Sequence, residues 1–187
     1  MNEATGNALL LNLAIIFMVL VCSIFLTSFA YSKAFKVKNR ITEELEKQNE
    51  YVNETENYSS YSNLELANLM YQEAINDDYS ENIDKWLDEV GYRKNTAPGR
   101  SSSSFCPSVA TLYKNNEIQT QNAKLLNGVT QREYCVYAVD TCKKSNNDRC
   151  GYYYYVISYM YLDIPILEDL VKIKVAGETE IFDKIYT

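Results

Sequence analysis

Hydrophobic and polar positions divide the chain into a long apolar run, a segment with helical periodicity, and a second half with strand-like alternation. The apolar run, residues 8–31, contains no charged residue, glycine or proline. As a helix rising about 1.5 Å per residue it is about 36 Å long, enough to cross a bilayer core of about 30 Å. The start Met-Asn-Glu lacks the basic residues of a secretory signal. The pattern therefore predicts a retained transmembrane helix behind a short N-terminal tail, residues 1–7.

Residues 32–52 continue the helical pattern in a polar form. The predicted apolar stripe is made of Ile41, Leu45 and Val52, completed by Gln48. Because no glycine or proline separates this segment from the apolar run, we expect one continuous helical rod. The polar stretch 53–62 then predicts a linker, which leaves residues 63–187 for one folded domain.

Two short helices are expected at the start of that domain. Ser62 can cap a helix over residues 63–75, because Glu65 follows three residues later. A second apolar stripe predicts a helix over residues 81–90, and Gly91 follows where a helix end needs left-handed backbone.

The remainder alternates as β-strands do. Residues 132–141 and 152–162 predict two strands that pair antiparallel around a polar loop. The expected cross-strand neighbours are Ala138 with Tyr154 and Val136 with Val156.

Weaker strand signals cover residues 108–113 and 117–120. Residues 170–175 and 178–182 predict a hairpin around Ala176-Gly177. The predicted fold class is α+β: a long transmembrane helix continuing as a polar rod, short helices, and a C-terminal antiparallel sheet with disulfides, packed on one or two helices.

Four of the five cysteines lie in the second half, and four cysteines allow three pairings. Cys142 and Cys150 flank the polar hairpin loop, within bridging reach, and a bond there would contribute about 2–3 kcal/mol. Cys106 is then left to pair with Cys135. A zinc site and reduced buried thiols are the alternatives, but the spacing lacks the Cys-x-x-Cys pairs of zinc sites. Disulfides favour an oxidising compartment.

The basic residues just after the apolar run predict the opposite orientation, with the C-terminal domain in the reducing cytoplasm rather than in an oxidising compartment. They are Lys33, Lys36, Lys38 and Arg40, and the positive-inside rule would place the domain that follows them in the cytoplasm. We favour the cysteines. The expected location is the plasma membrane, with a single pass, a cytoplasmic N-terminus and an extracytoplasmic domain.

Composition removes several function classes. The chain has no histidine, so nucleophile–histidine pairs and histidine-containing zinc sites are excluded. The formal net charge is −7, and all acids except Glu3 follow Arg40, which argues against a nucleic-acid partner. Neither a phosphate-binding loop nor a dinucleotide fingerprint is found. We therefore expect no enzyme, no cofactor, no metal site and no small-molecule substrate. The 17 tyrosines are expected to fill the sheet.

The plan of the chain resembles the pseudopilins and minor pilins of type IV-like systems, especially the TadE/TadF-like proteins of tight-adherence pili. The resemblance rests on the apolar helix from Ala8, its polar continuation over residues 36–41, and a strand–proline–strand ending within residues 155–180. It implies a structural or assembly protein whose partners are membrane lipid and other membrane or pilin-like subunits. Two positions depart from the pattern: no basic residue precedes Gly6, the candidate processing site, and Leu11 stands where that group carries glutamate.

Polar residues inside the apolar run are candidates for helix–helix packing. Asn12, Ser23 and Thr27 fall near one helical face, where they could form interhelical hydrogen bonds. Lipid-facing polar residues are the alternative for this face. At the level of function, a membrane-anchored binding or sensor domain with a tyrosine-rich ligand surface is the second hypothesis, and a cytoplasmic domain on a membrane anchor is the third.

Overall fold

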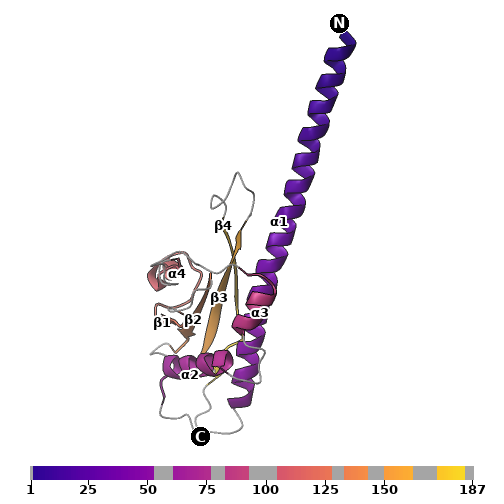
Figure 1. Ribbon diagram of the computed structural model, residues 1–187. Coiled ribbons are helices and arrows are strands. Elements are labelled where there is room, and N and C mark those ends of the chain that lie inside the picture. The colour runs from indigo at the N-terminus through magenta and orange to yellow at the C-terminus, as the bar shows by residue number, and fades with distance from the viewer. Residues whose placement is uncertain are drawn as a thin grey trace.

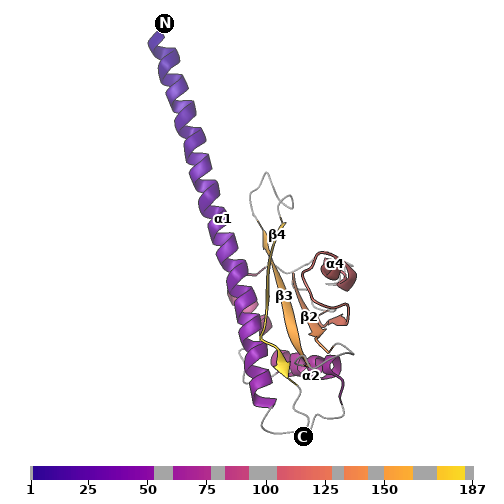
Figure 2. The same ribbon diagram turned by 180° about the vertical axis from the view of Figure 1, so that it is seen from behind.

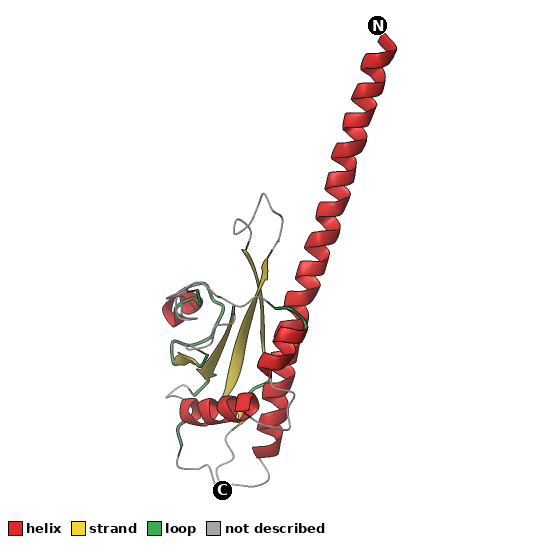
Figure 3. Cartoon of the chain, viewed as in Figure 1, coloured by secondary structure: helices red, strands yellow, loops and turns green. Residues whose placement is uncertain are grey.

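A computed structural model describes residues 2–52, 61–76, 83–92, 105–127, 133–142, 150–161 and 172–183. The helices are α1 (Asn2–Val52), α2 (Asn63–Asn76), α3 (Ile83–Glu89) and α4 (Val109–Lys114). The strands are β1 (Ala123–Leu125), β2 (Tyr134–Asp140), β3 (Gly151–Tyr161), β4 (Lys172–Glu178) and β5 (Phe182–Asp183). The chain is α+β, with a long N-terminal helix beside an antiparallel sheet (Figure 1, Figure 3).

α1 is a single helix of 51 residues. Its N-terminal half projects away from the rest of the molecule, whereas its C-terminal half lies along the sheet (Figure 1, Figure 2). The prediction of one rod is confirmed. The helix begins at Asn2, so residues 2–7 of the predicted tail are helical too. Most of the predicted linker lies outside the described residues.

The strand order is β1-β2-β3-β4, and every pairing is antiparallel. β2 and β3 pair in the predicted register, with Ala138 opposite Tyr154 and Val136 opposite Val156. This register follows from the neck of the hairpin, where Cys142 lies opposite Cys150, and a slip of one residue would turn every side chain to the other face.

The predicted hairpin around Ala176-Gly177 is wrong. β4 runs straight through both residues, and β4 and β5 pair in succession with the same edge of β3. At Thr179, between them, the amide donates to the Tyr154 carbonyl (3.0 Å) and the hydroxyl accepts from the Tyr154 amide (2.9 Å). β3 has 11 residues and so offers an edge long enough for both strands.

The two weaker strand predictions are also wrong. Residues 109–114 form helix α4, whose first turn is capped by the Ser108 hydroxyl accepting from the Thr111 amide at 3.2 Å. Residues 117–120 form no strand, and the strand that pairs with the outer side of β2 is β1. With three residues, β1 has too little sequence to show a period and exists because β2 offers it a partner.

Both predicted short helices are confirmed. At α2, the Ser62 amide donates to the Glu65 carboxylate at 2.9 Å, and the Glu65 amide donates to the Ser62 hydroxyl at 3.3 Å. α3 is followed by Gly91 in left-handed geometry, with φ of 60°. A side chain at that φ would be strained, which explains the glycine.

Both faces of the sheet are buried. α1, α2 and α3 cover one face, where Val136, Tyr152 and Tyr154 lie in the core. The other face carries Tyr137 and Tyr153 and is covered by α4 and its flanking segments. Covering both faces explains why β3 reads as a continuous aromatic and apolar run rather than an alternating one.

Candidate functional site

The N-terminal half of α1 exposes an apolar surface on all sides. Its exposed large apolar side chains, from Leu9 to Phe29, have 52% to 72% of their surface accessible. Burying one such side chain is worth about 1.5–3 kcal/mol, so leaving all of them in water would forgo tens of kcal/mol. Within the described residues this is the one helix long and apolar enough to span a membrane. It is compatible with a membrane anchor.

The C-terminal half of α1 buries a single stripe against the sheet. The stripe consists of Ala34, Val37, Ile41, Leu45 and Asn49. At the Ala34 end of the stripe, small residues let α1 and β3 approach each other closely: the Ser158 hydroxyl of β3 donates to the Ala34 carbonyl at 2.7 Å. The predicted stripe member Gln48 instead donates to the Glu73 carboxylate of α2 at 3.2 Å, on the surface.

Asn49 holds the lower end of α1 through a buried polar network. Its amide nitrogen donates to the Leu45 carbonyl at 2.6 Å, and its amide oxygen accepts from the Tyr152 hydroxyl. The neighbouring Tyr154 hydroxyl donates to the Ala67 carbonyl of α2 at 2.9 Å. Burial raises the pKa of both tyrosines above the ordinary value of 10, which keeps their hydroxyls protonated as donors. No sequence pattern indicates this role, because an isolated Asn on a helix belongs to no periodic stripe or motif.

The outer face of the sheet is fastened in a similar way. The Tyr137 hydroxyl donates to the Pro107 carbonyl at 2.6 Å, and that of Tyr155 donates to the Glu117 carboxylate at 2.9 Å. Lys174 of β4 also pairs with Glu117. The pKa of Glu117 is lowered: desolvation alone would raise it, but the hydrogen bonds from Lys174 and Tyr155 outweigh that effect.

The two disulfides pair as predicted. Cys106 is bonded to Cys135 with 5.8 Å between the Cα atoms, and Cys142 to Cys150 with 4.6 Å. The first links the segment over the outer face to β2. The second closes the β2–β3 end of the sheet. Cys22, in the apolar half of α1, is a free thiol.

The carboxylate of Asp140 organises the second disulfide. It accepts from the Asn63 side chain at 2.9 Å, from the Cys142 amide at 2.9 Å and from the Asn122 side chain at 2.7 Å. Asn63 is the first residue of α2, so this cluster joins α2, the disulfide and the end of β2. By joining these elements, the Asp140 carboxylate has a structural role in the fold.

The basic cluster after the apolar run is used by the fold. The Lys33 ammonium donates to the Gly91 carbonyl at 2.6 Å, just past α3. Lys38 lies 4.8 Å from the Phe35 ring centre and against Gly177. Arg40 pairs with Glu44 at 2.8 Å. Three of the four basic residues therefore have a structural reason to be where they are.

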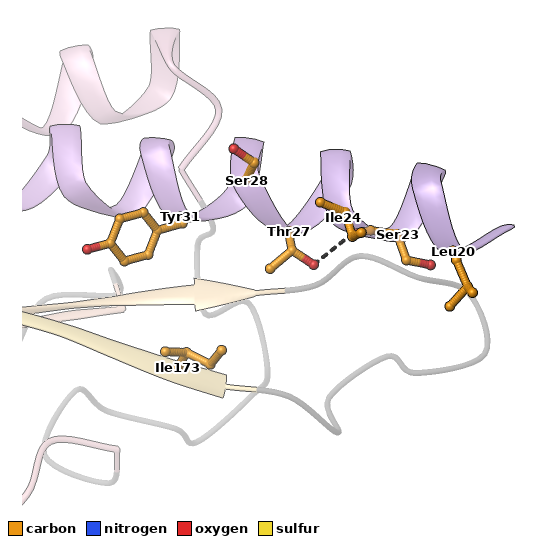
Figure 4. Close-up of a pocket in the computed structure, with 7 residues that line it drawn as sticks. All are labelled: Leu20, Ser23, Ile24, Thr27, Ser28, Tyr31 and Ile173. Atoms are coloured by element: carbon orange, nitrogen blue, oxygen red, sulfur yellow. Dashed lines mark hydrogen bonds between the residues drawn. The ribbon is translucent and has the colours of Figure 1, made fainter. Parts of the chain in front are cut away.

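The three predicted helix-packing residues have different surroundings. Ser23 and Thr27 line a groove of about 520 Å³ between α1 and Ile173 at the start of β4, with Leu20, Ile24, Ser28 and Tyr31 (Figure 4). The Thr27 hydroxyl donates to the Ser23 carbonyl and the Ser23 hydroxyl to the Val19 carbonyl, each at 2.8 Å. Asn12 lies far from the groove, exposed, and its side chain makes no hydrogen bond to the described residues.

Comparison with known proteins identifies no relative: no family model, no curated protein and no solved structure matches this chain.

Proposed function

We propose that this chain is a single-pass, membrane-anchored structural subunit of pilin-like type, with its α+β domain outside the cytoplasm. The observation that carries the proposal is the division of α1. One half is apolar all round and bare, and the other half is the spine on which the domain is built. A helix shared in this way can present its bare half to lipid and to other membrane subunits while holding the domain at a fixed distance.

The extracytoplasmic location is supported by the two disulfides, because such bonds persist in oxidising compartments. The positive-inside signal has a competing explanation, since Lys33, Lys38 and Arg40 make contacts that the fold needs. Their position after the apolar run is therefore weaker support for a cytoplasmic domain.

The binding or sensor hypothesis is weakened, because the tyrosine side chains on which it was based are buried. It required the tyrosine-rich strand to present a ligand surface, but Tyr152 to Tyr155 are at most 7% exposed. Their hydroxyls are also committed to carbonyl, carboxylate and amide groups of the covering elements.

Thiol labelling in intact cells tests the orientation. A membrane-impermeant maleimide should leave the four cysteines of the wild-type domain unlabelled, and should label them once an impermeant phosphine reductant is added outside. The matched control carries Cys142→Ser and Cys150→Ser, and should lose the part of the signal that belongs to this pair. Labelling that requires cell breakage and no reductant would place the domain in the cytoplasm.

Photo-crosslinking tests the assembly role. A benzoylphenylalanine at Asn12 should form adducts with partner subunits, because Asn12 is an exposed polar residue of the bare half. The control position is Leu10, two residues away and on the opposite side of the helix. Adducts at neither position, in a protein shown to be in the membrane, would leave an anchored domain with no assembly role.

A further inference from the structure

The end of the sheet nearest Tyr31 lies beside the membrane helix rather than clear of it. Ile173 of β4 shares the groove with Leu20, Ile24 and Thr27 of α1 (Figure 4). Leu20 precedes Tyr31, the last residue of the apolar run, by 11 residues, which corresponds to about 16 Å along a helix. If α1 spans a bilayer, a groove that begins at Tyr31 and ends at Leu20 extends well into one leaflet.

The groove is lined for an apolar occupant. Among the described residues, seven line the groove and none of these is charged. Two of the hydroxyl-bearing lining residues, Ser23 and Thr27, donate to carbonyls of their own helix, which leaves Ser28 and Tyr31 as the polar groups of the described lining. A partner helix held mainly by polar contacts would need more free donors than these. The first charge after the apolar run, Lys33, is bonded to Gly91 and marks where the polar region begins.

We propose that the Ile173 end of β4 enters the leaflet nearest the domain, and that lipid acyl chains fill the groove between it and α1. The proposal rests on α1 being the membrane anchor of the proposed function. The depth to which β4 can enter the bilayer is limited. β4 is an edge strand, and the side of it that faces away from β3 has no strand partner among the described residues. Unpaired backbone groups are costly in hydrocarbon, so Ile173 lies near the interface and not at the bilayer centre.

Depth-dependent quenching tests this in the full-length protein, reconstituted in phosphatidylcholine vesicles. The background is Cys22→Ser, in which the native disulfides leave no other thiol to react. An environment-sensitive fluorophore is attached in turn to Ile173→Cys, Ile181→Cys and Met18→Cys. Ile173 and Ile181 form a matched pair of isoleucines that are both 42% exposed. Ile173 lies at the start of β4, whereas Ile181 lies beyond the other end of β4, just before β5.

The label at 173 should emit at shorter wavelength than the label at 181, and should lose most of its emission to lipids with a shallow doxyl group. A deep doxyl group should quench it less. The label at 18 should be quenched more by the deep doxyl group than by the shallow one, because it lies near the bilayer centre. The label at 181 should be quenched by neither lipid. Thermal unfolding should match between the 173 and 181 variants, since both sites are on the surface.

The outcomes separate this inference from the anchor on which it rests. Quenching at 18 with none at 173 would overturn the inference and leave the anchor intact. No quenching at 18 would remove the anchor, and the inference with it. Crosslinking at 173 between two copies, with no lipid quenching, would show that a second chain's helix occupies the groove and would also overturn the inference.

Discussion

The two halves of α1 are one continuous helix with opposite relations to their surroundings. Residues 8–31 are apolar on every side and mostly exposed, whereas residues 34–49 bury one apolar stripe, with Glu44 beside it, and leave the remaining side chains exposed or half-buried. A narrow stripe is what a helix needs when one face meets a folded domain and the other meets water. An all-round apolar surface is stable only in an apolar surrounding. The contrast is compatible with a helix whose two halves meet different surroundings, one apolar and one aqueous.

The largest expected effect comes from breaking the packed half. Leu45→Ala should lower the free energy of unfolding of the domain by about 2–5 kcal/mol, because it leaves a cavity at a fully buried site. Urea unfolding followed by near-ultraviolet circular dichroism measures this. The matched control is Leu26→Ala in the bare half, where the side chain is 52% exposed. Equal losses in the two variants would contradict the division of α1.

The second-largest effect is expected from a charge placed in the bare half of α1, which should weaken membrane insertion. Met18→Arg should oppose membrane insertion by about 2.5–3.5 kcal/mol, because it places a charge near the centre of the span. The control is Asn39→Arg, on the exposed side of the packed half, and it should remain inserted. The measurement is the fraction of protein that stays with membranes after an alkaline carbonate wash. If Met18→Arg is retained as well as Asn39→Arg, α1 is not the anchor.

A smaller effect sharpens the account of the packed half. Asn49→Ala should destabilise the domain by about 1–3 kcal/mol, because the buried Tyr152 hydroxyl loses its acceptor. Combining it with Tyr152→Phe should recover part of the loss, since the unpaired hydroxyl is then removed. Gln48→Ala, which removes only a surface hydrogen bond, is the control. A loss at Asn49 no larger than at Gln48 would mean that the network contributes little.

The smallest effect belongs to the bare half. Thr27→Val should change stability and membrane retention by no more than about 0.5 kcal/mol, because the Thr27 hydroxyl bonds only to its own helix. Ser158→Ala is the comparison: its hydroxyl joins β3 to α1, and its loss should cost about 1 kcal/mol. Loss of subunit crosslinking on Thr27→Val would instead restore the predicted role of Thr27 in helix packing.

Local chemistry was enough to predict much of this fold. The apolar run, its helical continuation, the Ser62 cap, the stop at Gly91 and the β2–β3 register each depend on residues close in sequence or on simple alternation. The pairing of Cys142 with Cys150 could be predicted for the same reason, because a hairpin neck brings both cysteines together.

What remained was decided by contacts between distant segments. β4 and β5 share an edge of β3 only because β3 is long enough for both. Asn49 is buried only because Tyr152 and Tyr154 of the sheet contact its side chain. The placement of Ile173 beside Thr27 also depends on how the sheet lies along α1. Such positions carry no local pattern, since the energy that selects them comes from partners elsewhere in the chain, which for Asn49 lie more than 100 residues away.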